Sequence, residues 1–230
     1  MSDATEPGDV RAVSNKSAVR GGGGLIKPHW TVRYMLAKWR LGRYQRSHPE
    51  EPWLTPTMVC FLDGWLRPTD VMVEFGSGRS TAWFARRVGR LISVEHHQGW
   101  HSQVNEKLKA EGLDRNVTYT LAPNEPTGYV AAAATGLGGS KADVVLVDGN
   151  HRWACATWAL GVVKPGGLIV IDDAQRYLRS RFDTPPAFGT HPELQRPEWG
   201  EFTERTRGWR RSCTTSGVTD TVALVAPIED

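Results

Sequence analysis

Short apolar runs alternate with helical patterns through the middle of the chain. Segments with helical spacing cover residues 81–88, 100–110 and 152–163. Five apolar runs are predicted to be strands: residues 71–75, 91–95, 117–121, 142–148 and 168–171. Continuous apolar strands separated by helices are typical of a parallel sheet that is covered on both faces. Right-handed crossovers then predict an α/β fold with a Rossmann-like, doubly wound, mostly parallel sheet.

The C-terminal part of the chain breaks this alternation. Residues 209–212 and 219–226 are predicted to be two strands joined by a loop, so we expect a C-terminal antiparallel hairpin. Residues 179–208 are rich in Pro, Arg and Trp and show no clean periodicity, which is typical of an insertion that covers a site. We interpret residues 122–140 as a second variable loop.

The N-terminal segment divides into two further parts. Residues 1–28 are polar and rich in glycine, a composition that predicts a flexible basic arm. Residues 29–53 are predicted to be a helical lid or interface segment, since apolar residues three or four apart share one helix face: Trp30, Tyr34, Ala37 and Leu41. A second helix is predicted from Pro56 to about residue 66, and the main domain covers residues 54–230.

Charge is unevenly distributed along the chain, although the net charge is only +3. No acidic residue occurs between Asp9 and Glu50. The same stretch holds nine basic residues: Arg11, Lys16, Arg20, Lys27, Arg33, Lys38, Arg40, Arg43 and Arg46. Such a stretch can contact nucleic acid, an anionic surface or an acidic partner, and a solvated arm is the alternative.

Cysteine usage and hydropathy indicate the compartment. The chain has three cysteines, isolated from one another and without a CxxC pair, which suits a reducing environment. No apolar run reaches membrane-spanning length, and the N-terminus lacks the apolar core of a signal peptide. We therefore expect a cytoplasmic protein without membrane contact.

The sharpest motif lies at the carboxyl end of the first predicted strand and reads Glu-Phe-Gly-Ser-Gly-Arg-Ser-Thr over residues 74–81. Gly76 and Gly78 permit a tight turn and a close approach of a ligand to bare backbone. A dinucleotide fingerprint would need a glycine where Thr81 stands, which disfavours an NAD-dependent oxidoreductase. The Glu74 carboxylate, two residues before the first glycine, favours a cationic ligand and would repel a pyrophosphate.

A second acidic residue ends the next predicted strand. Glu95 stands 21 residues after Glu74 and can accept hydrogen bonds from both hydroxyls of a ribose. His96 follows it, and adenine stacking or ordinary loop polarity explains a histidine there. Together these features describe a nucleoside that carries a positive charge and no phosphates.

These residues resemble the class I S-adenosylmethionine-dependent methyltransferases, closest in pattern to small-molecule O-methyltransferases. The resemblance covers about residues 54–178 and rests on four segments in order: residues 73–78, 94–95, 147–149 and 164–167. It implies that Glu74, Gly76 and Gly78 line the methionine end of the cofactor and that Glu95 holds its ribose. The remaining implied contacts are polar: Ser77, Ser80, Thr81, His96 and Asp148. An unrelated doubly wound domain, with glycines used only in packing, is the alternative.

Three acidic side chains are predicted to share one rim of the sheet. Asp148 ends the fourth strand, and Asp172 and Asp173 end the fifth, so their carboxyl groups should lie side by side. A Mg²⁺ ion would stabilise such a cluster and could bind a substrate hydroxyl. The alternative is that Asp172 and Asp173 cap the following helix while Asp148 orders its own loop.

The catalytic residues expected beside this rim are His151 and Asp148. His151 follows Asp148 by three residues, and an imidazole can take a proton from a hydroxyl at neutral pH. A hydrogen bond from His151 to a backbone carbonyl is the alternative. Arg152 could anchor an acidic substrate or pair with Asp172.

The function expected from these residues is S-adenosylmethionine-dependent methylation of a hydroxyl on a small molecule. The acid-free N-terminal stretch supports a second hypothesis, an RNA methyltransferase, although no Asn-Pro-Pro-Tyr-like loop follows the fourth strand. A non-catalytic nucleoside-binding or interaction protein is the third. The N-terminal helix also suits a homodimer contact.

Overall fold

A computed structural model of the chain describes residues 31–182, 184–185 and 197–228. Its centre is a seven-stranded sheet with the strand order β3-β2-β1-β4-β5-β7-β6. The strands are β1 (Val71–Phe75), β2 (Arg90–Glu95), β3 (Val117–Leu121), β4 (Ala142–Val147), β5 (Val163–Ile171), β6 (Arg210–Thr215) and β7 (Asp220–Val225). The first five strands pair in parallel, and β7 pairs antiparallel with both β5 and β6. This architecture confirms the predicted Rossmann-like sheet with a C-terminal hairpin.

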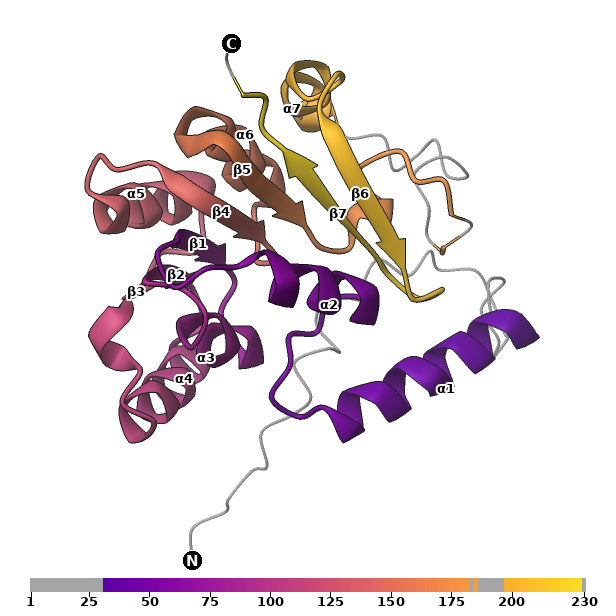
Figure 1. Ribbon diagram of the computed structural model, residues 1–230, viewed down its shortest axis with the longest axis horizontal. Coiled ribbons are helices and arrows are strands. Elements are labelled where there is room, and N and C mark those ends of the chain that lie inside the picture. The colour runs from indigo at the N-terminus through magenta and orange to yellow at the C-terminus, as the bar shows by residue number, and fades with distance from the viewer. Residues whose placement is uncertain (1–30, 183, 186–196, 229–230) are drawn as a thin grey trace, which may run out of the picture.

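Helices cover both faces of the sheet. They are α1 (Val32–Ser47), α2 (Pro56–Trp65), α3 (Arg79–Ala85), α4 (Gln98–Ala110), α5 (Pro126–Leu137), α6 (Arg152–Val162) and α7 (Gly200–Arg205). In Figure 1, α5, α6 and α7 lie on one side of the strands, and α2, α3 and α4 lie on the other. Side chains alternate between the two faces along a strand, so Val73 and Phe75 pack under α5 and α6 while Met72 packs towards α2 and α3.

One long helix was missed by the sequence pattern. The predicted loop of residues 122–140 contains the helix α5, which packs on β1, β2 and β3. Its start and end carry ordinary signals, with Pro126 in the first turn and Gly138 in the left-handed conformation (φ 64°) after the last. Its alanine-rich middle has no stripe of larger apolar residues at helical spacing, so the sequence pattern did not predict a helix there.

Two boundaries also differ from prediction. The strand β5 begins at Val163 and not at the predicted residue 168, so residues 164–167 belong to its first half, where the register with β4 shifts. Within the predicted insertion of residues 179–208, the described part contains the short helix α7. Phe202 of α7 is fully buried and packs into the core on the α5–α6 side.

The N-terminal helix α1 lies at the edge of the molecule (Figure 1). The side chains of Tyr34, Ala37 and Leu41 are half-buried, which confirms the predicted inner face, and the backbone of Gly217 in the β6–β7 turn lies close to Ala37. The opposite face exposes four large apolar side chains: Val32, Met35, Leu36 and Trp39. Trp30 and the arm of residues 1–28 lie outside the described residues. The domain boundaries and the role of α1 as lid or dimer contact stay predictions.

None of the described helices has the length and hydrophobicity needed to cross a lipid bilayer.

Candidate active site

The glycine motif forms a tight contact between two loops at the carboxyl ends of β1 and β4. Gly76 has φ of +90°, and a Cβ atom there would lie 2.6 Å from the Gly149 nitrogen and Cα atom. The Gly76 amide donates to the Val94 carbonyl oxygen at 3.0 Å, which joins the same loop to β2. Both the positive φ and the lack of space require glycine at position 76.

Glu74 lies beneath this loop and is completely buried. Its carboxylate accepts hydrogen bonds from three hydroxyl groups, those of Ser80 (2.5 Å), Thr81 (2.7 Å) and Ser93 (2.6 Å). Burial raises the pKa of Glu74 to about 7, although the three hydroxyl donors act in the opposite direction. The carboxylate therefore ties β1 to β2 and to the first turn of α3. The direct contact predicted between Glu74 and a cationic ligand stays a prediction.

Glu95 is pinned at the end of β2 and is 4% exposed. One carboxylate oxygen accepts from the backbone amides of His96 and His97, both at 2.8 Å. The other oxygen accepts from the Ser77 amide at 3.2 Å and the Ser77 hydroxyl at 2.9 Å. The Trp100 indole fixes the same loop by donating to the Ser77 carbonyl oxygen at 2.8 Å. A rigid carboxylate with a hydroxyl partner suits the diol of a ribose, since a ribose hydroxyl can replace that of Ser77.

The three acidic residues of the predicted rim come together around an arginine. The partly buried Arg152 guanidinium donates to the carbonyl oxygens of Asp148 (2.7 Å), Gly149 (3.0 Å) and Asp172, and to the Asp148 carboxylate at 3.0 Å. The Asp173 carboxylate lies 3.9 Å away. The sequence alternative of an Arg152–Asp172 contact is found at the backbone carbonyl, while the Asp172 carboxylate accepts from the Thr221 hydroxyl at 2.8 Å.

This arrangement does not support the predicted Mg²⁺ site at Asp148, Asp172 and Asp173. Among the described residues, no three His, Cys, Asp or Glu side chains are grouped so that they could hold a metal ion. The physical reason is that the Arg152 guanidinium supplies the positive charge that a metal ion would bring, and hydroxyl donors use the oxygens of Asp172 and Asp173. Asp173 stands at the start of a short 3-10 helix but makes no side-chain cap, so the capping alternative is not found for it.

The rim carboxyl groups differ in proton affinity. Burial, and then the neighbouring charge of Asp173, raise the pKa of Asp148 to about 6, against the lowering effect of Arg152. Burial also raises the pKa of Asp172 well above its ordinary value. Burial acts on Asp173 as well, but the charges of Arg152 and Arg176 outweigh it and lower the pKa of that carboxyl group. A proton that binds to the rim therefore prefers the carboxyl group of Asp148 or Asp172 to that of Asp173.

His151 caps the start of α6 with an uncommon backbone conformation. Its φ is 52°, in the left-handed region, and its ring makes no hydrogen bond to the helix. Instead, Nε2 lies 3.1 Å from Oδ1 of Asn124, and the ring meets the edge of the Tyr129 ring. Neither Asn124 nor Tyr129 was singled out from the sequence, because both belong to the segment interpreted as a variable loop.

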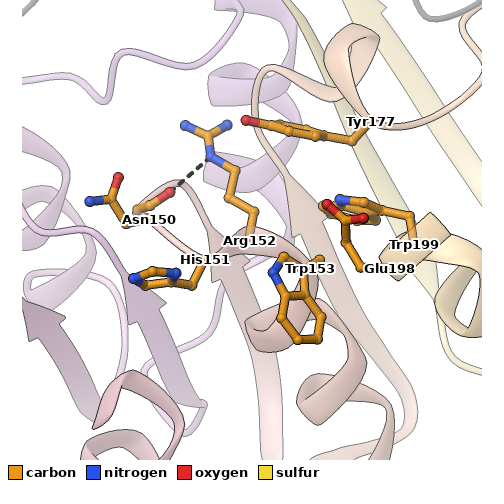
Figure 2. Close-up of a pocket in the computed structure, with 8 residues that line it drawn as sticks. Asn150, His151, Arg152, Trp153, Tyr177, Glu198 and Trp199 are labelled. Atoms are coloured by element: carbon orange, nitrogen blue, oxygen red, sulfur yellow. Dashed lines mark hydrogen bonds between the residues drawn. The ribbon is translucent and has the colours of Figure 1, made fainter. Parts of the chain in front are cut away.

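A pocket of about 220 Å³ opens beside His151 (Figure 2). Its lining residues come from the loop after β4, from the turn after β5 and from residues 198–199: Gly149, Asn150, His151, Arg152, Trp153, Tyr177, Glu198 and Trp199. The rings of Tyr177 and Trp199 stack with centroids 5.1 Å apart and form one wall, opposite Asn150 and His151 in Figure 2. This aromatic wall was missed from the sequence, since its two rings are 22 residues apart without a shared motif.

Comparison with known families agrees with this geometry. Residues 73–174, from β1 to the turn after β5, match a family model described as a methyltransferase domain. This part of the chain is similar to a methyltransferase domain. The matched range includes both glycine loops, Glu74, Glu95 and the acidic rim. The match agrees with the resemblance of the motifs to class I S-adenosylmethionine-dependent methyltransferases.

Solved structures share the fold of this chain at low sequence identity. An O-methyltransferase from Streptomyces achromogenes, TomG, is 22% identical with a TM-score of 0.54, covering 83% of this chain and 89% of its own. An O-methyltransferase from Bacillus cereus is 16% identical with a TM-score of 0.54, covering 87% and 92%. A candidate rRNA methylase from Clostridium thermocellum is 13% identical with a TM-score of 0.52, covering 74% and 94%. Among curated proteins, none matches the sequence significantly.

Proposed function

We propose that this protein is a methyltransferase that transfers the methyl group of S-adenosylmethionine to a hydroxyl group of a small molecule. The observation that carries the proposal is the pocket of about 220 Å³ that is lined by His151 on one side and by the stacked rings of Tyr177 and Trp199 on the other. A pocket of this volume suits a small planar acceptor. A histidine at its edge suits an acceptor that must lose a proton.

The cofactor would lie over the loops that follow β1, β2 and β4. Glu95 would hold the ribose hydroxyls, and the backbone of residues 76–78 would line the methionine end. Glu74 would act from below, because its three hydroxyl bonds fix the first turn of α3. S-adenosylmethionine, when bound, supplies an electrophilic methyl group on a sulfonium, a good leaving group, so alignment provides much of the rate.

The residues of the pocket would supply orientation and proton transfer. The rings of Tyr177 and Trp199 would pack against a planar acceptor and exclude water. His151 would accept the proton from the acceptor hydroxyl. The partly buried Arg152 would hold the ends of β4 and β5, and thus the two sides of the pocket, at a fixed separation.

A methyl-transfer assay tests this proposal. Purified protein is incubated with S-adenosylmethionine and a panel of small aromatic alcohols, and in separate reactions with the corresponding amines. The products are identified by mass spectrometry. We expect methylated hydroxyls, and we expect His151→Ala to lower kcat on the order of 10²-fold. His48→Ala, an exposed substitution in the segment after α1, is the control and should leave the rate unchanged. Methylation of the amines alone, or full activity of His151→Ala, would contradict the proposal.

The basic helix α1 supports a second candidate, methylation of RNA. It carries five exposed basic residues and no acidic one: Arg33, Lys38, Arg40, Arg43 and Arg46. Phosphate contacts weaken as salt is added, so binding of an RNA oligonucleotide should fall steeply between 50 and 200 mM salt if this candidate holds. Removal of residues 1–46 should then abolish it. Absence of binding at low salt would exclude this candidate.

A further inference from the structure

Three loops meet beside His151 through their polar side chains. The loops follow β2, β3 and β4. Oδ1 of Asn124 lies 3.1 Å from Nε2 of His151 and 3.1 Å from Nδ2 of Asn150. The same Asn150 nitrogen lies 3.2 Å from Nε2 of His96, whose Nδ1 lies 3.0 Å from a carboxylate oxygen of Glu95. A continuous chain of polar contacts therefore runs from the carboxylate at the end of β2 to the histidine of the pocket.

The directions of these hydrogen bonds follow from the chemistry of the groups. Nδ2 of Asn150 is an amide nitrogen and can only donate, so both Oδ1 of Asn124 and Nε2 of His96 accept from it. Oδ1 of Asn124 is a carbonyl oxygen and can only accept, so its contact with His151 requires a proton on Nε2. A neutral imidazole carries one ring proton. In neutral His151 the basic nitrogen is therefore Nδ1.

The backbone of His151 is arranged so that its ring is available for this contact. At the start of a helix a polar side chain usually bonds the free amides of the first turn, whereas the His151 ring makes no such bond. The carbonyl oxygen of His151 accepts from the amides of Ala154 (2.9 Å) and Cys155 (3.2 Å), which fixes its left-handed conformation. Among the described residues, Asn124 is the hydrogen-bond partner that holds the ring.

We propose that Asn124 is a positioning residue that holds His151 in the tautomer with its proton on Nε2, leaving Nδ1 to accept the proton of the acceptor hydroxyl. The catalytic part of this inference rests on the proposed function. The tautomer itself does not, since it follows from the hydrogen bonds alone. Asn124 also contacts Asn150, and through Asn150 and His96 it links His151 to Glu95, the residue proposed to hold the cofactor ribose.

The tautomer can be measured without any substrate. The full chain is labelled with ¹⁵N-histidine, and long-range ¹H–¹⁵N correlation spectra are recorded at a pH where the His151 ring is neutral, with His151→Ala used to assign its signals. We expect one protonated nitrogen at Nε2 and one unprotonated nitrogen at Nδ1. In Asn124→Leu the two nitrogens should move towards averaged shifts, whereas Asn124→Asp, which keeps an acceptor oxygen, should retain the Nε2–H form. A proton on Nδ1 in the wild type, or an unchanged spectrum in Asn124→Leu, would overturn the inference.

Kinetics separate this inference from the proposed function. In Asn124→Leu, kcat should fall about tenfold or more while the affinity for S-adenosylhomocysteine changes less than twofold. Asn124→Asp should recover activity and shift the rise of kcat to higher pH, because a negative charge beside His151 favours its protonated form. Gln103→Ala, an exposed amide on α4, is the control. Full activity of Asn124→Leu overturns the inference alone, whereas the expected spectra without methylation of any hydroxyl would defeat the proposed function alone.

Discussion

The contribution of a buried carboxyl group to the free energy of unfolding depends on pH, and Glu74 is such a group. With no solvent contact, its ionised form is stabilised only by three hydroxyl donors. The sequence placed Glu74 at the end of the first strand. It could not predict the hydroxyl groups around the carboxylate, because Ser80, Thr81 and Ser93 come from two different elements. Glu95 differs from Glu74, since backbone amides and the Ser77 hydroxyl donate to both of its carboxylate oxygens.

The substitution Glu74→Gln should change how stability depends on pH. Because burial raises the folded-state pKa of Glu74 to about 7, above the ordinary 4.5, its contribution is present below pH 4.5 and is lost as pH rises through 7. Glutamine stays neutral, so the stability of the variant relative to the wild type should improve by about 3 kcal/mol between pH 4.5 and pH 8. Urea unfolding at several pH values measures this, with the exposed Glu106→Gln as control. A difference that does not change with pH would contradict it.

At the scale of elements, Arg152 joins the ends of β4 and β5. Its planar guanidinium bonds three backbone carbonyl groups from the two strand ends, which a point charge such as lysine could not do at once. The acidic rim itself was predictable, because strands four and five are neighbours in a doubly wound sheet. The compensating cation was not, since a sequence cannot show whether an arginine folds back over its own loop or points to solvent.

Arg152→Met should destabilise the protein strongly. It removes a mostly buried positive charge and leaves the carboxyl group of Asp148 without its cationic partner. The expected loss is about 3 kcal/mol or more in the free energy of unfolding, measured by urea titration near pH 7. Arg207→Met removes an exposed ion pair with Glu204 and should cost less than about 1 kcal/mol. Equal effects of the two substitutions would show that Arg152 does not hold the strand ends.

At the scale of the whole molecule, the alternation of strands and helices was enough to predict the sheet and its hairpin. The hydrophobic pattern did not predict α5, because its small residues form no apolar stripe. It also could not predict the pocket wall, because Tyr177 and Trp199 are distant in the sequence and stack only in the folded chain. The proposed cofactor side of the site uses local motifs at strand ends, so candidate residues could be chosen there from spacing. The acceptor side depends on contacts between distant segments, so it could not.

Calorimetric titration with S-adenosylhomocysteine tests the central claim most directly, that the loops after β1 and β2 bind an adenosyl nucleoside. We expect one saturable site in the wild type, no heat with NAD, and an affinity at least about tenfold weaker in Glu95→Gln, which loses charged hydrogen bonds to the ribose. Circular dichroism shows whether each protein is folded. A folded wild-type protein that binds no S-adenosylhomocysteine, or a Glu95→Gln variant that binds it as tightly, would contradict the account.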